Sequence, residues 1–274
     1  MEKPFLQPKI CWVISMILIK LGGSVITDKS KPYFFKKNTV DRLAYEIKTA
    51  DQQVMLVHGA GSFGHILAKE YHLKDGFQDK KQLYGMVATL EKVQKLNTMI
   101  LEVFLTHSLP VVSLPPHVFL ELSDQKPGDV NLYFFQRYLK YGFIPVTFGD
   151  VVLDTKRGCT ICSGDLLMYL LADYFKPEKV VFVFDEDGLF TANPKLEKNA
   201  QFIEETSVHN LKSFSTGADT HADVTKGMQG KLDIIAAIGK LGIDTVLVNG
   251  NKDKRLHDIL VNKKTVCTYI RGEK

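Results

Sequence analysis

Short apolar runs alternate with longer amphipathic stretches along almost the whole chain. The runs are rich in Val, Ile and Leu, and most of them are continuous; they cover residues 17–21, 54–57, 111–114, 144–148, 180–184, 245–248 and 265–270. Continuous apolar runs are typical of strands that are covered on both faces, as in parallel sheets. We expect helices between them, at residues 39–50, 62–71, 81–105, 132–141, 165–175, 227–241 and 256–260. This order predicts an α/β fold with helices on both faces of an open sheet.

The length of 274 residues fits one large domain or two small ones. We interpret residues 1–15 as an N-terminal extension or as the result of a mis-assigned start, because Met16 stands directly before the first apolar run. Residues 16–274 then form one domain, whose best internal boundary is the segment KPEK at 176–179. The segments 74–81 and 122–130 are polar and are predicted to be surface loops. No run of 18 apolar residues occurs, so no transmembrane helix and no membrane partner are expected.

Charge and cysteine content exclude several classes of protein. The 35 basic and 31 acidic residues give a net charge of +4, and no continuous basic stripe or aromatic platform suggests nucleic acid binding. Cys159 and Cys162 form a C-x-x-C, but neither a second pair nor nearby histidines follow at metal-ligand spacing. We therefore predict no protein metal site, a structural role for these cysteines in a glycine-rich turn, and reduced thiols in the cytoplasm.

The first unusual loop ends the first apolar run with the sequence I-K-L-G-G-S, residues 19–24. Ligands of open α/β sheets gather at the carboxyl ends of the strands, where this loop lies. Its two glycines let backbone N–H groups approach a ligand closely, as phosphate binding requires. Lys20 lies inside an apolar strand, which is costly unless the ammonium group meets an anion. The alternative is a solvated lysine at the edge of the sheet.

The second loop, H-G-A-G-S-F-G-H at 58–65, follows the second apolar run and opens a helix. It matches G-x-G-x-x-G, the dinucleotide-binding pattern. A dinucleotide site would have this pattern in the first strand–helix unit, whereas here it lies in the second. It would also need an acidic residue at the end of the next strand; Asp79 has the spacing but lies in a polar loop. An anion site at a helix N-terminus is the better interpretation, with His65 able to bond a phosphate oxygen.

Three further segments carry polar groups beside predicted strands or helices. S-G-D at 163–165 precedes a helix, so that Ser163 or Asp165 can cap it while facing the same crevice. D-E-D-G at 185–188 follows an apolar run, and D-V-T-K-G-M at 223–228 leads into a helix that carries Lys231. The patterns of P-loop proteins, protein kinases and α/β-hydrolases are absent from the sequence.

Taken in order, these motifs resemble the amino acid kinase superfamily and, within it, the isopentenyl phosphate kinases. The resemblance covers about residues 16–270. It implies a three-layer αβα sandwich with a mostly parallel central sheet of about eight strands. It also implies a homodimer, ATP and Mg²⁺ as cofactors, an acceptor lobe at 16–177 and an ATP lobe at 178–274. The implied reaction is ATP-dependent phosphorylation of isopentenyl phosphate to isopentenyl diphosphate, in isoprenoid biosynthesis.

The resemblance also assigns roles to individual residues. It places a catalytic set at Lys20, Lys29, His65, Asp165 and Lys231. It places acceptor binding at Ala60, His65 and Gly164, and ATP binding at Lys20, Gly22, Gly23, Ser24, Gly61, Asp185, Phe190, Gly227 and Lys231. Two positions depart from the family pattern: Ala60 and Lys226 each stand where a glycine is usual.

Other hypotheses remain open at this stage. A related kinase with another phosphate or phosphonate acceptor, such as fosfomycin, would use the same loops. A nicotinamide-dependent oxidoreductase would use the glycine loop at 59–64. An isoprenoid tail would need an apolar slot, for which the sequence offers Tyr71, Tyr84, Met86, Val87 and Ile100, although apolar stripes on helices usually face the core.

Overall fold

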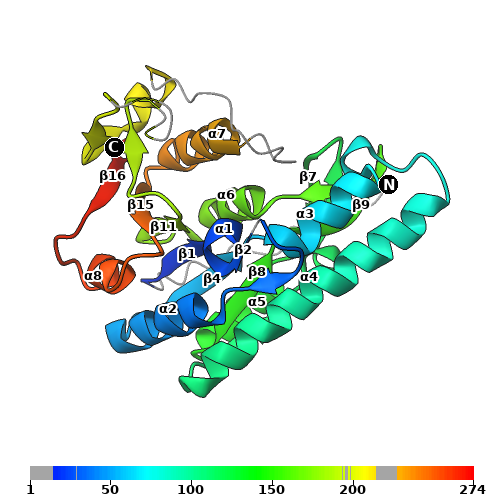
Figure 1. Cartoon of the computed structure of the whole chain (residues 1–274), viewed down its shortest axis with the longest axis horizontal. Coiled ribbons are helices and arrows are strands. Elements are labelled where there is room, and N and C mark those ends of the chain that lie inside the picture. The colour runs from blue at the N-terminus through cyan, green and yellow to red at the C-terminus, as the bar shows by residue number, and fades with distance from the viewer. Residues whose placement is uncertain (1–14, 29, 193, 195–196, 198, 214–226) are drawn as a thin grey trace.

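An eight-stranded sheet forms the centre of the molecule (Figure 1). The computed structural model describes residues 15–28, 30–192, 194, 197, 199–213 and 227–274. The strand order is β14-β16-β15-β11-β1-β4-β8-β5, and the pairs from β15 to β5 are all parallel. β16 runs antiparallel to β15 at one side of the sheet. The strands span β1 (Ile17–Leu21), β4 (Val54–His58), β5 (Val111–Ser113), β8 (Ile144–Phe148), β11 (Lys179–Phe184), β14 (Glu205–Ser207), β15 (Asp244–Asn249) and β16 (Cys267–Arg271).

Helices cover both faces of this sheet. Alternate residues of a strand point to opposite faces, and on β1 Leu18 packs into one core cluster while Ile17, Ile19 and Leu21 pack into the other. The Leu18 face is covered by α5 (Tyr133–Lys140), α6 (Gly164–Phe175) and α7 (Gly227–Gly239). The opposite face is covered by α1 (Gly23–Ile26), α2 (Lys37–Ala50), α4 (Lys81–Thr106) and α8 (Arg255–Leu260), with α3 (Gly61–Glu70) packed on α4.

The three-layer α/β architecture predicted from the apolar pattern is therefore confirmed. Each predicted strand and helix is present, with ends that differ by no more than two residues. The short elements beside them are β2 (Thr27–Asp28), β3 (Phe34–Phe35), β12 (Leu189–Phe190), β13 (Phe202–Ile203) and the 3-10 helices η1 (Leu73–Asp75), η2 (Pro116–Val118) and η3 (Val208–Ser213). Within the described ranges, no helix is both long and apolar enough to cross a membrane.

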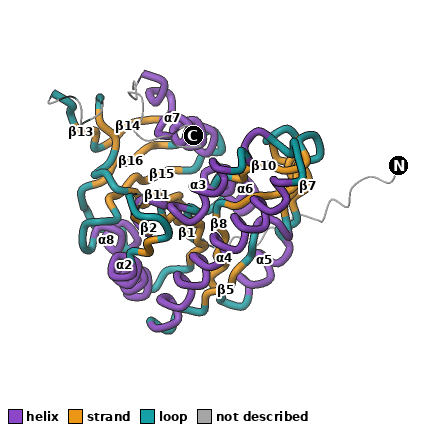
Figure 2. Tube along the Cα trace, turned by 45° about the vertical axis from the view of Figure 1, so that its right-hand side comes forward, coloured by secondary structure: helices purple, strands orange, loops and turns teal. Residues whose placement is uncertain are grey.

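The sequence pattern missed a second sheet, which has the order β10-β9-β6-β7. It contains β6 (Leu120–Ser123), β7 (Lys126–Val130), β9 (Asp150–Asp154) and β10 (Gly158–Cys162), and in Figure 2 β7 and β10 lie far from β13 and β14. The predicted loop at 122–130 is wrong, because β6 and β7 form a hairpin there. Both turn residues, Asp124 and Gln125, have positive φ, and the Asp154 carboxylate accepts their N–H groups at 2.9 and 2.8 Å.

The two neighbouring cysteines lie in this second sheet. Cys159 and Cys162 belong to β10 and not to the predicted glycine-rich turn. Both thiols are free and buried, and burial raises the pKa of each. Their residues occupy different core clusters, so the structural role predicted for them agrees with the packing.

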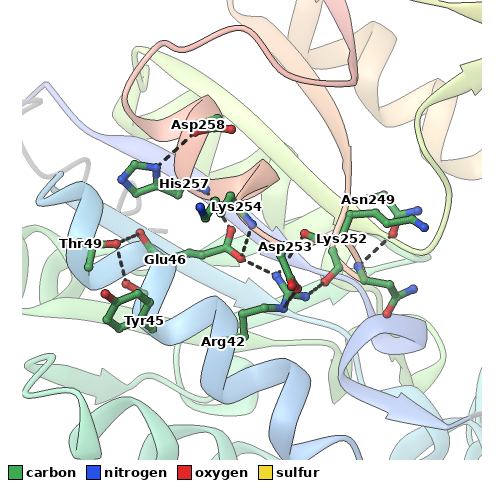
Figure 3. A network of polar contacts seen from close by, with 12 residues as sticks. Arg42, Tyr45, Glu46, Thr49, Asn249, Lys252, Asp253, Lys254, His257 and Asp258 are labelled. Atoms are coloured by element: carbon green, nitrogen blue, oxygen red, sulfur yellow. Dashed lines mark hydrogen bonds and ion pairs between the residues drawn. The ribbon is translucent and has the colours of Figure 1, made fainter.

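A buried carboxylate ties α2 to the segment between β15 and α8 (Figure 3). Glu46 accepts the backbone N–H groups of Lys254 at 3.0 Å and His257 at 3.1 Å, and Arg42 donates to it at 2.5 Å. Arg42 also donates to the carbonyl oxygens of Gly250 and Lys252. The side chain of Glu46 is 5% exposed, so water cannot replace these bonds if the carboxylate is removed.

We therefore predict that Glu46→Ala lowers the free energy of unfolding by about 3 kcal/mol, because two backbone N–H groups lose their buried acceptor and Arg42 loses one of its several acceptors. Urea denaturation measures this change. The matched control is Glu205→Ala, which breaks the half-exposed pair with Arg271 at 2.8 Å and should cost below about 1 kcal/mol. Equal losses in the two variants would contradict the prediction.

Candidate active site

The carboxyl ends of neighbouring central strands remain joined beyond their last residues. The amide nitrogens of Gly22, Gly59 and Gly149 each donate to a carbonyl oxygen of the adjacent strand, at 2.8, 3.0 and 3.0 Å. The loops after β1, β4 and β8 therefore begin side by side at one edge of the sheet. The expectation that the strand-end loops meet there is confirmed by this geometry.

The glycines of these loops allow the backbones to touch. A Cβ atom at Gly59 would lie 2.7 Å from the nitrogen of Gly23, and one at Gly61 would lie 2.2 Å from Oγ1 of Thr27. Gly61 also has φ +51°, a conformation that costs little only for glycine. Thr27 Oγ1 donates to the carbonyl of Gly23 at 2.7 Å and accepts the N–H of Ser62 at 3.1 Å. One hydroxyl thus fixes the first glycine loop against the second.

A pocket of about 1110 Å³, open mouth included, lies over this edge. It brings together ten of the residues singled out in the sequence: Lys20, Gly22, Gly23, Ser24, Ala60, His65, Gly164, Asp165, Asp185 and Lys231. These residues come from five separate stretches of the chain. Their convergence supports the interpretation that the motifs belong to one site.

A lysine–aspartate–lysine cluster is part of the pocket wall. Nζ of Lys20 is 2.5 Å from Oδ1 of Asp165, and Nζ of Lys231 is 3.8 Å from the same oxygen. Both ammonium groups also lie over the ring of Phe182, at 5.8 and 5.7 Å from its centroid. The side chains of Lys20 and Asp165 are only 8% and 14% exposed. Lys231 is 17% exposed, so the cluster holds one buried and one half-buried cation against one carboxylate, a net positive charge that favours an anionic ligand.

The Asp165 carboxylate stays ionised in this cluster. Burial alone would raise its pKa, but Lys20 and Lys231 outweigh burial and lower the pKa to about 2. Asp165 lies in the first turn of α6, and Ser163 caps that helix by accepting the N–H of Leu166 at 3.1 Å. Of the two residues that the sequence offers as caps, Ser163 is the one that caps the helix. The Asp165 carboxylate contacts the two lysines instead.

Three of the predicted site residues do not line the pocket. Gly61 lies beside Ala60 but packs against Thr27 and does not line the pocket. Gly227 precedes Met228, which does line it. Phe190 also lies outside the lining and packs on Phe202, with ring centroids 5.4 Å apart. Lys29 and Lys226 lie outside the described residues. Asp185, by contrast, lines the pocket and accepts the hydroxyl of Ser24 at 2.8 Å.

One end of the pocket is apolar, and its residues were missed in the sequence. They are Ala68, Thr89, Val93, Val151 and Ile161. None of the five residues suggested for an apolar slot lines the pocket. Ile100 is buried in the core, and Tyr84 and Val87 are 70% and 64% exposed. A usable signal was the spacing of four residues between Thr89 and Val93, which places both on one helical face.

His58 lies beneath the pocket and is fully buried. Its Nδ1 is 3.0 Å from the carbonyl oxygen of Gly59, and its Nε2 is 3.2 Å from Oδ1 of Asn97. The ring stacks on Phe148 with centroids 5.1 Å apart. Burial lowers the pKa of His58 to about 4, although both polar contacts act in the opposite direction. The imidazole is therefore neutral in the folded protein at pH 7.

This burial predicts a pH-dependent stability. Since the pKa of His58 is lower in the folded than in the unfolded chain, its contribution is complete above pH 6.5 and is lost as the pH falls toward 4. We expect the free energy of unfolding to fall by about 2 kcal/mol between pH 7.5 and pH 5 from this group. Urea titrations of the parent and His58→Gln measure it. An equally large fall in the variant would contradict the assignment.

Comparisons with known proteins agree with this geometry. The amino acid kinase family model matches residues 15–249. An isopentenyl phosphate kinase of Methanothermobacter thermautotrophicus is 33% identical over 267 residues, which cover 94% of this chain and 100% of the relative. An isopentenyl phosphate kinase of Methanocaldococcus jannaschii is 30% identical and covers 90% of this chain and 96% of its own. A solved structure of isopentenyl phosphate kinase superposes with a TM-score of 0.81 at 30% identity, over 93% of this chain and 99% of that one.

Proposed function

The chain belongs to the amino acid kinase family, and from that premise we propose that it transfers the γ-phosphoryl group of ATP to isopentenyl phosphate, giving ADP and isopentenyl diphosphate. The observation that carries the proposal is the Lys20–Asp165–Lys231 cluster, set between glycine loops in a pocket with one apolar end. Such a pocket suits two anionic substrates, one of which has an apolar tail. The relatives named isopentenyl phosphate kinase match nearly the full length of the chain.

We divide the pocket between the two substrates as the resemblance implies. The ATP phosphates lie along Lys20 and the loop at 22–24, with Asp185 and Lys231 on the nucleotide side of the pocket. Gly61, Phe190 and Gly227, which the resemblance also assigns to the nucleotide, lie outside the lining. The acceptor phosphate lies against the amides of Ala60 and Gly164 and the imidazole of His65, with Lys29 beside both phosphates. The acceptor lobe is 16–177 and the ATP lobe is 178–274, a boundary that falls in the connection between α6 and β11.

The chemistry needs positioning and charge more than a base. An oxygen of the acceptor phosphate is already anionic; it attacks the γ-phosphorus, the bond to the bridging β–γ oxygen breaks, and ADP leaves with that oxygen. The obstacle is the repulsion between two anions. Lys20 and Lys231 offset it, while Asp165 holds both ammonium groups in place. His65 orients the acceptor for in-line attack.

The residues present also fit Mg²⁺ that arrives with the nucleotide. Among the described residues no group of three or more His, Cys, Asp or Glu side chains could cage a metal ion. Mg²⁺ characteristically keeps several waters and binds substrate phosphates with one or two carboxylates, so a protein cage is not required. Asp185, at the pocket wall, is the carboxylate that best fits this part. When bound, the ion would neutralise charge on the β- and γ-phosphates.

The apolar end of the pocket suits a short hydrocarbon tail. Ala68 of α3, Val93 of α4, and Val151 and Ile161 of the second sheet all line the pocket. Burial of each methylene group there stabilises a bound tail by about 0.8 kcal/mol. A charged acceptor side chain, such as that of glutamate, gains nothing from such a wall and loses hydration.

An ADP-release assay with a panel of acceptors tests the proposal. We expect the highest kcat/KM with isopentenyl phosphate, lower values with dimethylallyl phosphate and fosfomycin, and no turnover with glutamate. A higher value with fosfomycin would favour the related kinase with a phosphonate acceptor. NADH binding without ADP release from any acceptor would favour the oxidoreductase hypothesis and overturn the proposal.

We also propose that the protein is a homodimer and that it works in the cytoplasm. The resemblance to the family supports both proposals. The free thiols of Cys159, Cys162 and Cys267 agree with a reducing compartment. Light scattering of the purified protein checks the dimer: a mass of about twice the 30.9 kDa chain is expected.

A further inference from the structure

Thr27 lies between the two glycine loops that the proposed function gives to different substrates. It begins β2, is 0% exposed and does not line the pocket. Its hydroxyl donates to the carbonyl oxygen of Gly23 at 2.7 Å and accepts the N–H of Ser62 at 3.1 Å. Gly23 belongs to the loop assigned to ATP, and Ser62 belongs to the helix that carries His65. The hydroxyl therefore joins the two substrate loops directly.

The helix α3 is capped by this hydroxyl and not by its own N-cap residue. The first amides of a helix lack partners within it, and a polar side chain at the N-cap usually accepts one of them. The N-cap of α3 is Ala60, which has no such side chain. The N–H groups of Phe63 and Gly64 turn back to the carbonyl oxygen of Ala60, each at 3.2 Å. Thr27 supplies the acceptor for Ser62 from 35 residues earlier in the chain.

Contact and hydrogen bonding together leave the two loops little freedom to move relative to each other. A Cβ atom at Gly23 would lie 2.8 Å from the Cα atom of Gly61, so the backbones already touch and cannot approach further. The Thr27 hydroxyl, bonded to both loops, opposes their separation, and its removal would leave two backbone groups without this partner. The spacing is thus limited by packing in one direction and by Thr27 in the other.

We propose that the Thr27 hydroxyl sets the distance between the γ-phosphate of ATP and the acceptor phosphate, which makes Thr27 a positioning residue for the transfer. The proposal rests on the proposed function, because it assumes ATP at residues 22–24 and the acceptor at His65. In-line transfer needs the reacting atoms about 3–3.5 Å apart, and a misplacement of about 1 Å can cost about a hundredfold in rate. Each loop keeps its own amides and side chains when the hydroxyl is removed. Loss of the hydroxyl should therefore lower the rate of transfer more than the binding of either substrate.

Two substitutions separate the hydroxyl from the rest of the side chain. Thr27→Val keeps the branched shape and removes both hydrogen bonds. We expect it to lower kcat at least about tenfold, with the KM values for ATP and for isopentenyl phosphate each changed by less than about threefold. Thr27→Ser keeps the hydroxyl and should stay within about threefold of the parental kcat. An unchanged kcat in Thr27→Val, or an equal loss in Thr27→Ser, would overturn the inference.

Thr268→Val is the matched control for lost stability. Thr268 is also 0% exposed and lies outside the pocket lining. Its hydroxyl likewise joins two segments, accepting the N–H of Leu189 at 2.7 Å and donating to the carbonyl oxygen of Ile203 at 2.6 Å. Urea titration should show similar losses of stability in the two valine variants, while kcat falls only in Thr27→Val. Equal losses of kcat would show that the fall follows stability and not loop spacing, and would overturn the inference.

Hydrogen–deuterium exchange separates failure of this inference from failure of the proposed function. ATP bound at the first loop should slow amide exchange in the peptide that begins α3, in the parent and in Thr27→Ser but not in Thr27→Val. If the parent phosphorylates no acceptor, the proposed function fails, and this measurement still decides whether Thr27 couples the loops. Absence of slowing in the parent, or equal slowing in Thr27→Val, would overturn the inference. The measurement on the parent needs no variant and applies even if Thr27→Val does not fold.

Discussion

Lys20→Met is expected to lower kcat by about a thousandfold while the protein stays folded. Lys20 lies within β1, is 6% exposed, and its Nζ is 2.5 Å from Asp165. Methionine has a similar length and is apolar, so it can occupy the buried strand position without a charge. What is lost is the cation that stabilises the transferring phosphoryl group, an interaction that is stronger in the transition state than in the ground state.

Steady-state kinetics and a urea titration together check this prediction. Lys48→Met is the matched control, because Lys48 lies on the exposed side of α2 and should be silent. The loss in Lys20→Met should appear in kcat and not only in the KM for ATP. A variant that is folded and retains more than about a tenth of the parental kcat would show that Lys20 has no direct part in the transfer.

His65→Ala is expected to spare ATP binding but to lower kcat/KM for the acceptor by about 10²–10³-fold. His65 lies in the first turns of α3, directly after the glycine loop, and lines the pocket. An imidazole there can fix the acceptor phosphate for in-line attack, and loss of such positioning is costly even when binding of the other substrate is intact.

Two measurements separate the substrates in this variant. Calorimetry should give an ATP affinity close to that of the parent, and the acceptor kinetics should carry the whole loss. His72→Ala, a substitution in the exposed residue after α3, serves as the control. Unchanged kcat and KM for the acceptor in His65→Ala would remove His65 from the site.

Most of the central sheet could be predicted because its inner strands, β1, β4, β8, β11 and β15, are buried on both faces, whereas the half-buried β14 at its edge was missed. Such strands are continuous apolar runs, as at 54–57 and 180–184, and their short length and richness in Val distinguish them from the helices. The second sheet escaped prediction for the opposite reason. β7 has the sequence KPGDV and is mostly exposed, and its hairpin turn depends on Asp154, about 30 residues away, which no local pattern reports.

The site, too, could be predicted only in part. Residues of the strand-end loops could be predicted, because the carboxyl ends of parallel strands meet at one edge and glycine loops mark where a backbone approaches a ligand. The apolar end of the pocket could not. It joins elements that are far apart in the chain, and the packing of the second sheet against α3 and α4 brings them together.

The most direct test of phosphoryl transfer is mass spectrometry of the products formed from isopentenyl phosphate and ATP with ¹⁸O in its γ-phosphoryl group. We expect isopentenyl diphosphate with the label in its terminal phosphate, and an equal amount of ADP. Labelled inorganic phosphate beside unchanged isopentenyl phosphate would show that the pocket hydrolyses ATP without using this acceptor, and would contradict the proposed function.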